Sequence, residues 1–216
     1  MKSFEMFFNM LPEGAATTMS VFFVTLIVAL PLSIPVALLR LSPNKTISKI
    51  TAFYIYLMRG TPLMLQLMFI FFALPLIPVV GIALERYTAI YAAFVLNYAA
   101  YYAEIIRGGV QAVPKGQWEA AKVLGLRKAY TFRKIIFPQV LKTVIPALSN
   151  EVITLVKDTS LVYVLGVTDV LKVAKSVSNT YSTFVPYILV GVIYLVIIAL
   201  LTRLLSHIEK RVSYYK

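Results

Sequence analysis

The chain of 216 residues is 60% hydrophobic and only 14% charged, and its mean hydropathy is +0.82. Soluble domains are nearer 25% charged, so the composition excludes a soluble globular protein. The net charge of +12 falls between apolar runs, as the positive-inside rule predicts for a membrane protein, and this argues against nucleic-acid binding. The absence of cysteine excludes disulfides, thiolate metal sites and iron–sulfur clusters, and with His207 as the single histidine no metal site is expected.

Uncharged, mostly apolar runs indicate membrane-spanning helices. Such runs cover residues 14–39, 60–84, 87–103 and 176–202, and about 18 or more such residues suffice to cross a bilayer. We predict an all-α, polytopic integral membrane protein that forms one transmembrane domain over residues 1–216. Its five predicted spans are 15–39, 50–76, 87–107, 143–165 and 184–205.

Two of these spans contain polar residues. The second begins either near Ile50, which includes Arg59, or at Gly60, and the fourth carries Asn150, Glu151, Lys157 and Asp158. Both are retained because an irregular segment in lipid would leave its backbone groups unsatisfied.

The distribution of Lys and Arg predicts the orientation. One side holds Arg40, Lys45, Lys49, the basic residues from Arg107 to Lys142, and the tail residues Arg203, Lys210, Arg211 and Lys216. The other side holds Lys2, Arg86, Lys172 and Lys175. Because the richer side is cytoplasmic, the N-terminus is expected outside and the C-terminus inside, which fits an odd number of spans.

The cytoplasmic segment between the third and fourth spans, residues 108–142, is the largest polar piece. Arg107 before Gly108-Gly109 is typical of a helix C-terminus. A short helix is then predicted over 117–126, ended by Gly125, and a basic helix over 127–137 is predicted to stop at Pro138. Trp118 beside small residues on one helix face favours a docking surface over a loop that only fixes topology.

A spaced motif in this segment resembles that of a known family. Glu119-Ala120-Ala121, three residues, Gly125, nine residues, Ile135, one residue and Phe137-Pro138 is similar to the EAA loop of binding-protein-dependent ABC importer permeases, with Phe137 in place of the usual leucine. The segments MRGTPLMLQLMF, YYAEIIRGGVQAVPKGQWEAA and LVKDTSLVYVLGVTDV resemble the polar amino acid subfamily, which includes glutamine, histidine and arginine permeases.

This resemblance implies a transport subunit in the plasma (inner) membrane of a prokaryote. Its partners would be a second permease copy or homologue, cytoplasmic ATP-binding subunits and an extracellular substrate-binding protein that delivers an amino acid. The ATPase would dock on Gln117, Trp118, Glu119, Ala120, Ala121 and Gly125.

The chain lacks the G-x-x-x-x-G-K-[ST] phosphate loop. We therefore expect no cofactor here, no catalytic residues, and ATP hydrolysis by a separate subunit. The basic flank of the loop would suit either an acidic partner or anionic lipid headgroups.

Polar residues within the predicted spans are candidates for substrate binding. Asn97, Tyr101 and Glu104 share one helix face, and Asn150 and Asp158 share another with Glu151 alongside. Thr61 precedes the helix-breaking Pro62, where a broken helix could expose backbone groups to a cavity.

Two interpretations of these residues stay open. They could pair and hydrogen-bond to hold helices together, or they could line a cavity that binds a zwitterion. Three acids, Glu104, Glu151 and Asp158, against Arg59 and Lys157 leave one excess negative charge, which favours a cationic amino acid.

Three other functions compete with ATP-driven import. A membrane hydrolase would have to use paired carboxylates, and an ion-coupled carrier would use Glu104 or Asp158 but leave the patterned loop without a role. A scaffold subunit would not need the polar faces.

Overall fold

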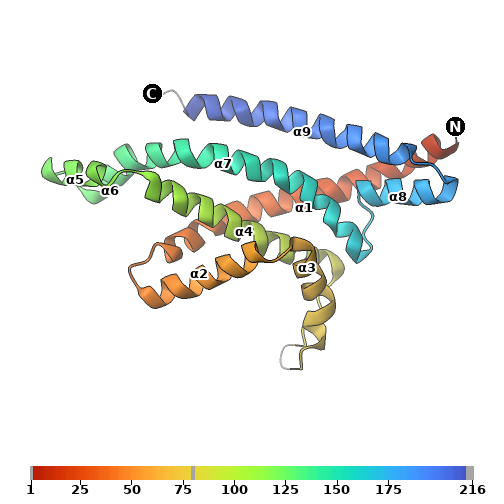
Figure 1. Ribbon diagram of the computed structural model, residues 1–216, viewed down its shortest axis with the longest axis horizontal. Helices are drawn as coiled ribbons and strands as arrows, with labels where there is room; N and C mark the ends of the chain where they lie inside the picture. The colour runs from red at the N-terminus through yellow and green to blue at the C-terminus, as the bar shows by residue number, and fades with distance from the viewer. Residues whose placement is uncertain (1, 79–80, 213–216) are drawn as a thin grey trace.

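Four long helices run side by side along the length of the molecule (Figure 1). The computed structural model describes residues 2–78 and 81–212, and within these ranges it contains helices and no strand. The long helices are α1 (Lys2–Arg40), α4 (Arg86–Ala112), α7 (Phe137–Asp158) and α9 (Val185–Val212). Short α5 (Lys115–Val123) and α6 (Lys128–Thr131) lie at one end, and α8 (Val170–Tyr181) lies near the other. Lys216, counted above in the cytoplasmic tail, lies outside the described residues.

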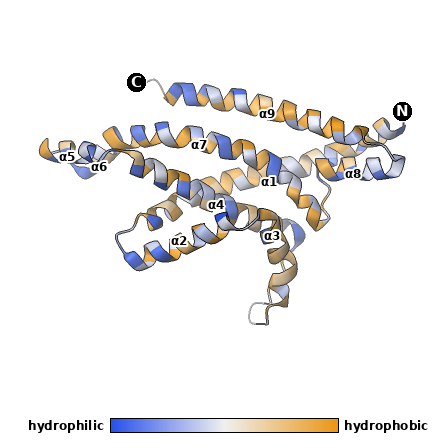
Figure 2. Cartoon of the chain, viewed as in Figure 1, coloured by the Kyte–Doolittle hydropathy of each residue, from blue (hydrophilic) through white to orange (hydrophobic). Residues whose placement is uncertain are grey.

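The helices support a polytopic membrane protein. In the described part of the chain α1, α4 and α9 are long and apolar enough to cross a membrane. The bent pair of α2 (Lys45–Gly60) and α3 (Leu63–Met68) with its continuation adds a fourth candidate if it acts as one span. Helix α7 carries four charged residues and is not among them, so the count of five spans stays a prediction. Figure 2 shows hydrophobic residues along most of α9 and hydrophilic ones interspersed along α7.

Helix α1 is longer than the predicted span and is packed tightly against α8. It begins at Lys2 and ends at Arg40. A Cβ atom on Gly14 would lie 2.9 Å from the carbonyl carbon and oxygen of Asp169 and 2.9 Å from Val173. A glycine is therefore required where these two helices meet.

The second predicted span is broken. Asn44 caps α2 (Lys45–Gly60) by accepting hydrogen bonds from the amides of Thr46 and Ile47 at 2.9 and 3.3 Å. Helix α3 (Leu63–Met68) continues through a π-helical turn (Phe69–Ala73) and a 3₁₀ turn (Leu74–Leu76). The two halves are bent by 104° at Thr61–Pro62, as the helix-breaking proline suggests, and whether they form one span stays a prediction.

The helix end predicted at Arg107 is wrong, because α4 continues to Ala112. Gly109 has a packing role instead, because a Cβ there would overlap Cγ2 of Val144, on α7. The two helices can cross this closely only without a side chain at position 109.

The polar segment 108–142, predicted to be cytoplasmic, is mostly helical, and one of its predicted helix ends is confirmed. Gly125 adopts φ +69° after α5, and its N–H donates to the Lys122 carbonyl while that of Leu126 donates to Ala121, which is a Schellman motif.

The stop predicted at Pro138 is wrong. A π-helical turn (Phe132–Ile136) leads directly into α7, and Pro138 lies in the first turn of α7, where its missing N–H is tolerated.

Helix α8 was not predicted, although the sequence carries its signals. Asp169 accepts hydrogen bonds from the amides of Leu171 and Lys172 at 3.2 and 2.9 Å. The buried residues Val170, Val173, Ala174 and Val177 follow with helical spacing. Burial raises the pKa of the Asp169 carboxyl, and the two backbone hydrogen bonds offset part of that effect.

Candidate functional site

The break between α2 and α3 follows from Pro62 and is held by two side-chain amides. In an unbroken helix the carbonyl of Met58 would accept from residue 62, but proline has no N–H to donate. Nε2 of Gln66 and Nδ2 of Asn97 donate to this carbonyl instead, each at 2.9 Å. An otherwise unsatisfied carbonyl in the membrane is thereby paired.

The other polar side chains near the break hydrogen-bond to one another in the same network. Asn97 is 4% exposed and donates also to Oε1 of Gln66 at 3.0 Å. Gln66 donates to Oγ1 of Thr61 at 2.7 Å, and that hydroxyl donates to the carbonyl of Leu57 at 2.8 Å. Asn97 and Thr61 therefore shape the break and have few free hydrogen bonds.

A pocket of about 270 Å³ lies beside this break. We call it the acidic pocket. Five of the seven predicted substrate residues line it: Thr61, Asn97, Tyr101, Glu151 and Asp158. The other lining residues are Pro62, Leu63, Tyr98, Thr154 and Leu161. Its volume is near the lower limit of about 300 Å³ for sites that hold one small molecule.

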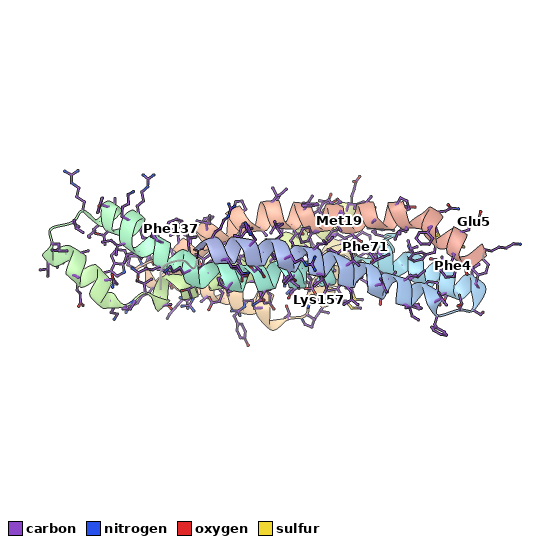
Figure 3. The ribbon with its side chains drawn as sticks, turned by 90° about the horizontal axis from the view of Figure 1, so that it is seen from above. Phe4, Glu5, Met19, Phe71, Phe137 and Lys157 are labelled. Carbon is purple, nitrogen blue, oxygen red and sulfur yellow. The ribbon has the colours of Figure 1, made fainter. Side chains whose placement is uncertain are left out.

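The acidic pocket contains two carboxylates and, among its described lining residues, no Lys or Arg. Tyr98 donates a hydrogen bond of 2.7 Å to Oδ2 of Asp158, which fixes that carboxylate against α4. Lys157 is exposed on α7 and is not a lining residue (Figure 3). The two carboxylates therefore make the pocket suited to cationic groups.

The remaining two predicted residues lie elsewhere. Oε1 and Oε2 of Glu104 accept hydrogen bonds from Arg107 at 2.6 and 2.8 Å, and Arg59 lies 3.8 Å away. Glu104 lines a second pocket of about 410 Å³, which we call the basic pocket because Arg40 and Arg59 also line it. Asn150 is exposed on α7 and lines neither pocket.

Sequence reasoning missed Gln66 and Tyr98. Gln66 is a lone polar residue four positions after Pro62 in an uncharged stretch, a signal for a partner to the carbonyl that a proline frees. Tyr98 is three residues before Tyr101 on the same helix, and its contact with Asp158 joins segments sixty residues apart.

The residues of the predicted docking surface share α5 and its C-terminal turn. Gln117, Trp118, Glu119 and Ala120 are exposed, Ala121 is buried, and Gly125 forms the turn. The ring of Trp118 stacks on Phe132 with centroids 6.5 Å apart, and the rings of Phe132 and Phe137 have centroids 6.1 Å apart, at the start of α7. Val123 and Leu124, which were not predicted, are 87% and 74% exposed.

Residues 29–214 match the family described as the binding-protein-dependent transport system inner membrane component. The chain belongs to this family. As such a permease it is a transport component of the inner membrane and not an enzyme, and the ATPase of such systems is a separate subunit.

Several known proteins are similar to this permease over nearly all of its length. The arginine transport system permease protein ArtQ of Bacillus subtilis is 38% identical, over 93% of this chain and 91% of the relative. The nopaline transport system permease protein NocM of Agrobacterium fabrum is 37% identical, over 94% and 87%. The crystal structure of an amino acid ABC transporter with histidines aligns with TM-score 0.85 and 36% identity, over 97% of this permease and 95% of that chain.

Proposed function

We propose that this permease forms the translocation path of an ATP-driven, binding-protein-dependent importer of polar amino acids, with preference for a cationic one. The observation that carries the proposal is the acidic pocket, where two carboxylates face a broken helix among apolar spans. Relatives named for arginine and glutamine transport support a polar amino acid as substrate, and the one named for arginine supports the cationic preference.

In this proposal the two carboxylates bind the two positive groups of a cationic amino acid. Glu151 and Asp158 would each take one, the α-ammonium or the side-chain cation, and the ring of Tyr101 would pack against the substrate. Backbone groups at Thr61 would meet the carboxylate, and Asn97 would act by holding the break in place. Glu104 would contact the substrate in the basic pocket. The substrate-binding role of Asn150 stays a prediction.

We propose that α5 and the turn at Gly125 receive the ATP-binding subunit. Trp118 contacts Phe132, and Phe132 contacts Phe137, so movement of α5 has an aromatic connection to the first turn of α7. Helix α7 carries both Glu151 and Asp158. A change at the docking surface would therefore reach the acidic pocket through one helix.

The complete transporter in this proposal contains further chains and a defined orientation. A second permease copy or homologue would complete the pore, and an extracellular binding protein would deliver the substrate. The N-terminal end of α1 and the C-terminal end of α9 lie at opposite ends of the molecule (Figure 1). That arrangement supports termini on opposite sides of the membrane, and the distribution of Lys and Arg supports a cytoplasmic C-terminus with α5 on the same side.

Uptake into proteoliposomes tests the proposal. The permease is reconstituted with its ATPase and binding protein, and uptake of labelled arginine, histidine and glutamine is measured with and without ATP. We expect ATP-dependent uptake, with Glu151→Gln and Asp158→Asn reducing arginine uptake by about tenfold or more, since each removes a charge partner. Glu13→Gln, an exposed carboxylate on α1, is the matched control and should leave uptake unchanged.

Other outcomes would contradict parts of the proposal. Uptake driven by a proton or sodium gradient without the ATPase would establish an ion-coupled carrier. Equal loss of glutamine and arginine uptake in both carboxylate variants would refute the cationic preference.

A further inference from the structure

The acidic and basic pockets are neighbours that share one side chain. Tyr101 lines both of them. The acidic pocket lies between the α2–α3 break and α7, whereas the basic pocket lies between α2, α4 and the C-terminal end of α1. A solute passing from one pocket to the other would have to pass Tyr101.

The two pockets carry opposite charge. Glu151 and Asp158 line the first, while Arg40 and Arg59 line the second. The one acid of the basic pocket, Glu104, is already engaged by two hydrogen bonds from Arg107. The basic pocket therefore attracts carboxylates, and the acidic pocket attracts ammonium or guanidinium groups.

Arg59 covers the shared residue. Its guanidinium lies over the ring of Tyr101, 5.1 Å from the centroid, and 3.8 Å from Oε1 of Glu104. The Arg59 side chain is 42% exposed. A long, partly exposed side chain with a ring contact and one long ion pair can leave this position without breaking a buried hydrogen bond.

The backbone beneath Arg59 is fixed. Arg59 lies in the last turn of α2, next to Met58, whose carbonyl is bound by Asn97 and Gln66. Displacement of α2 would break these hydrogen bonds, whereas rotation of the Arg59 side chain would not. The movable part at this point is therefore the side chain.

We propose that the basic pocket is the next segment of the translocation path, on the α5 side of the acidic pocket, and that Arg59 closes the route between them by resting on Tyr101. The carboxylate of an amino acid is the chemical group that would compete for Arg59, so arrival of substrate would draw Arg59 from the ring. This inference rests on the proposed transport function.

Cysteine labelling tests the closure, because the natural chain has no cysteine to replace. Thr154→Cys places a thiol in the acidic pocket, and Ala52→Cys places one in the basic pocket. A membrane-impermeant thiol reagent is applied to inside-out membrane vesicles, which expose the face expected to carry α5. We expect Ala52→Cys to react at least about tenfold faster, since an open minor state would hold about 10% of the population or less.

Removal of the closure should abolish the difference. With Arg59→Ala or Tyr101→Ala added, Thr154→Cys should react at nearly the rate of Ala52→Cys. Arg40→Ala is the matched control, because Arg40 lines the basic pocket and donates to Ser48, and it should leave Thr154→Cys slow.

Two results would overturn the proposal. One is equal reactivity of both thiols in the otherwise unchanged chain. The other is a Thr154→Cys rate that stays slow in both Arg59→Ala and Tyr101→Ala while Ala52→Cys in the same backgrounds labels normally, which also shows that those chains are folded. Labelling needs neither substrate nor ATPase, so its result is independent of whether amino acid uptake is observed.

Discussion

Nδ2 of Asn97 donates a hydrogen bond of 2.9 Å to the carbonyl oxygen of Met58, the carbonyl that Pro62 leaves without its helical donor. This contact joins α4 to the last turn of α2 and sets the angle at which α3 departs. Asn97 is thereby a structural residue of the site as well as part of its lining.

Asn97→Leu should destabilise the protein. The Met58 carbonyl would retain only Gln66, and Gln66 would lose a donor to its own oxygen, at a cost of about 1–2 kcal/mol for interhelical hydrogen bonds in membrane proteins. Thermal unfolding in detergent measures this, and a double-mutant cycle with Gln66→Leu should show coupling. Asn150→Leu, at an exposed position of α7, should unfold like the natural chain. Weakened substrate binding in Asn97→Leu with unchanged unfolding would assign Asn97 to the substrate instead.

Gly109→Ala should separate α4 from α7. The new methyl group would overlap Cγ2 of Val144, and overpacking of this kind costs about 1–3 kcal/mol. The free energy of unfolding should recover in the double variant Gly109→Ala with Val144→Ala. Gly108→Ala is the matched control because a Cβ there meets nothing within 4 Å, and it should be neutral or stabilising by up to about 1 kcal/mol. Equal effects of the two alanines would contradict the close crossing.

Gly125→Ala should weaken the end of α5 through its backbone. The position has φ +69°, where a residue with a Cβ costs about 1–2 kcal/mol, although open space surrounds it. Asn tolerates this conformation better, so unfolding free energies should follow the order Gly, Asn, Ala. Gly116→Ala, inside α5 and equally open, should not be destabilising. Identical values for Gly125→Asn and Gly125→Ala would show that the turn is not what stabilises this region.

Val123 and Leu124 should contribute to the partner contact. Two adjacent apolar side chains exposed to 87% and 74% at the polar end of the molecule are typical of an interaction site. The double variant Val123→Ser, Leu124→Ser should lose co-purification with the ATPase while unfolding normally. Tyr130→Ser, also exposed in this segment, is the control. Undiminished co-purification would leave Trp118, Glu119 and the basic flank as the contact, or lipid headgroups as the partner of that flank.

The sequence predicted the presence of the long helices better than it predicted where they end. Apolar runs indicate α1, α4 and α9 directly, because length and hydropathy are properties of one segment. The local signals at Gly109 and Pro138 suggested helix ends, and both proved to be interior or initial positions. Whether a glycine ends a helix or admits a neighbour depends on Val144, which is 35 residues away and cannot be identified from the local pattern.

In the candidate site, too, the sequence pattern predicted which residues share a helix face but not the contacts that they make. Helical spacing placed Asn97 and Tyr101 on one face, and Asn150 and Asp158 on another with Glu151 alongside. All of these except Asn150 line one pocket. Glu104 lies one helical turn after Tyr101 and forms an ion pair with Arg107. The i, i+3 spacing of these two residues allowed such a pair, but spacing alone could not show that it forms. Nor could it show that hydrogen bonds within the fold already occupy Asn97 and Thr61.

The contact of Gly14 with the backbone of Asp169 has a consequence for transport. Because α1 has no side chain at position 14 to separate it from Asp169 and Val173, the end of the molecule that contains these residues is expected to behave as one stiff body during the transport cycle. The route that opens to either side would then be set away from that end, midway along the molecule, by the angle at Thr61–Pro62 and the position of α7.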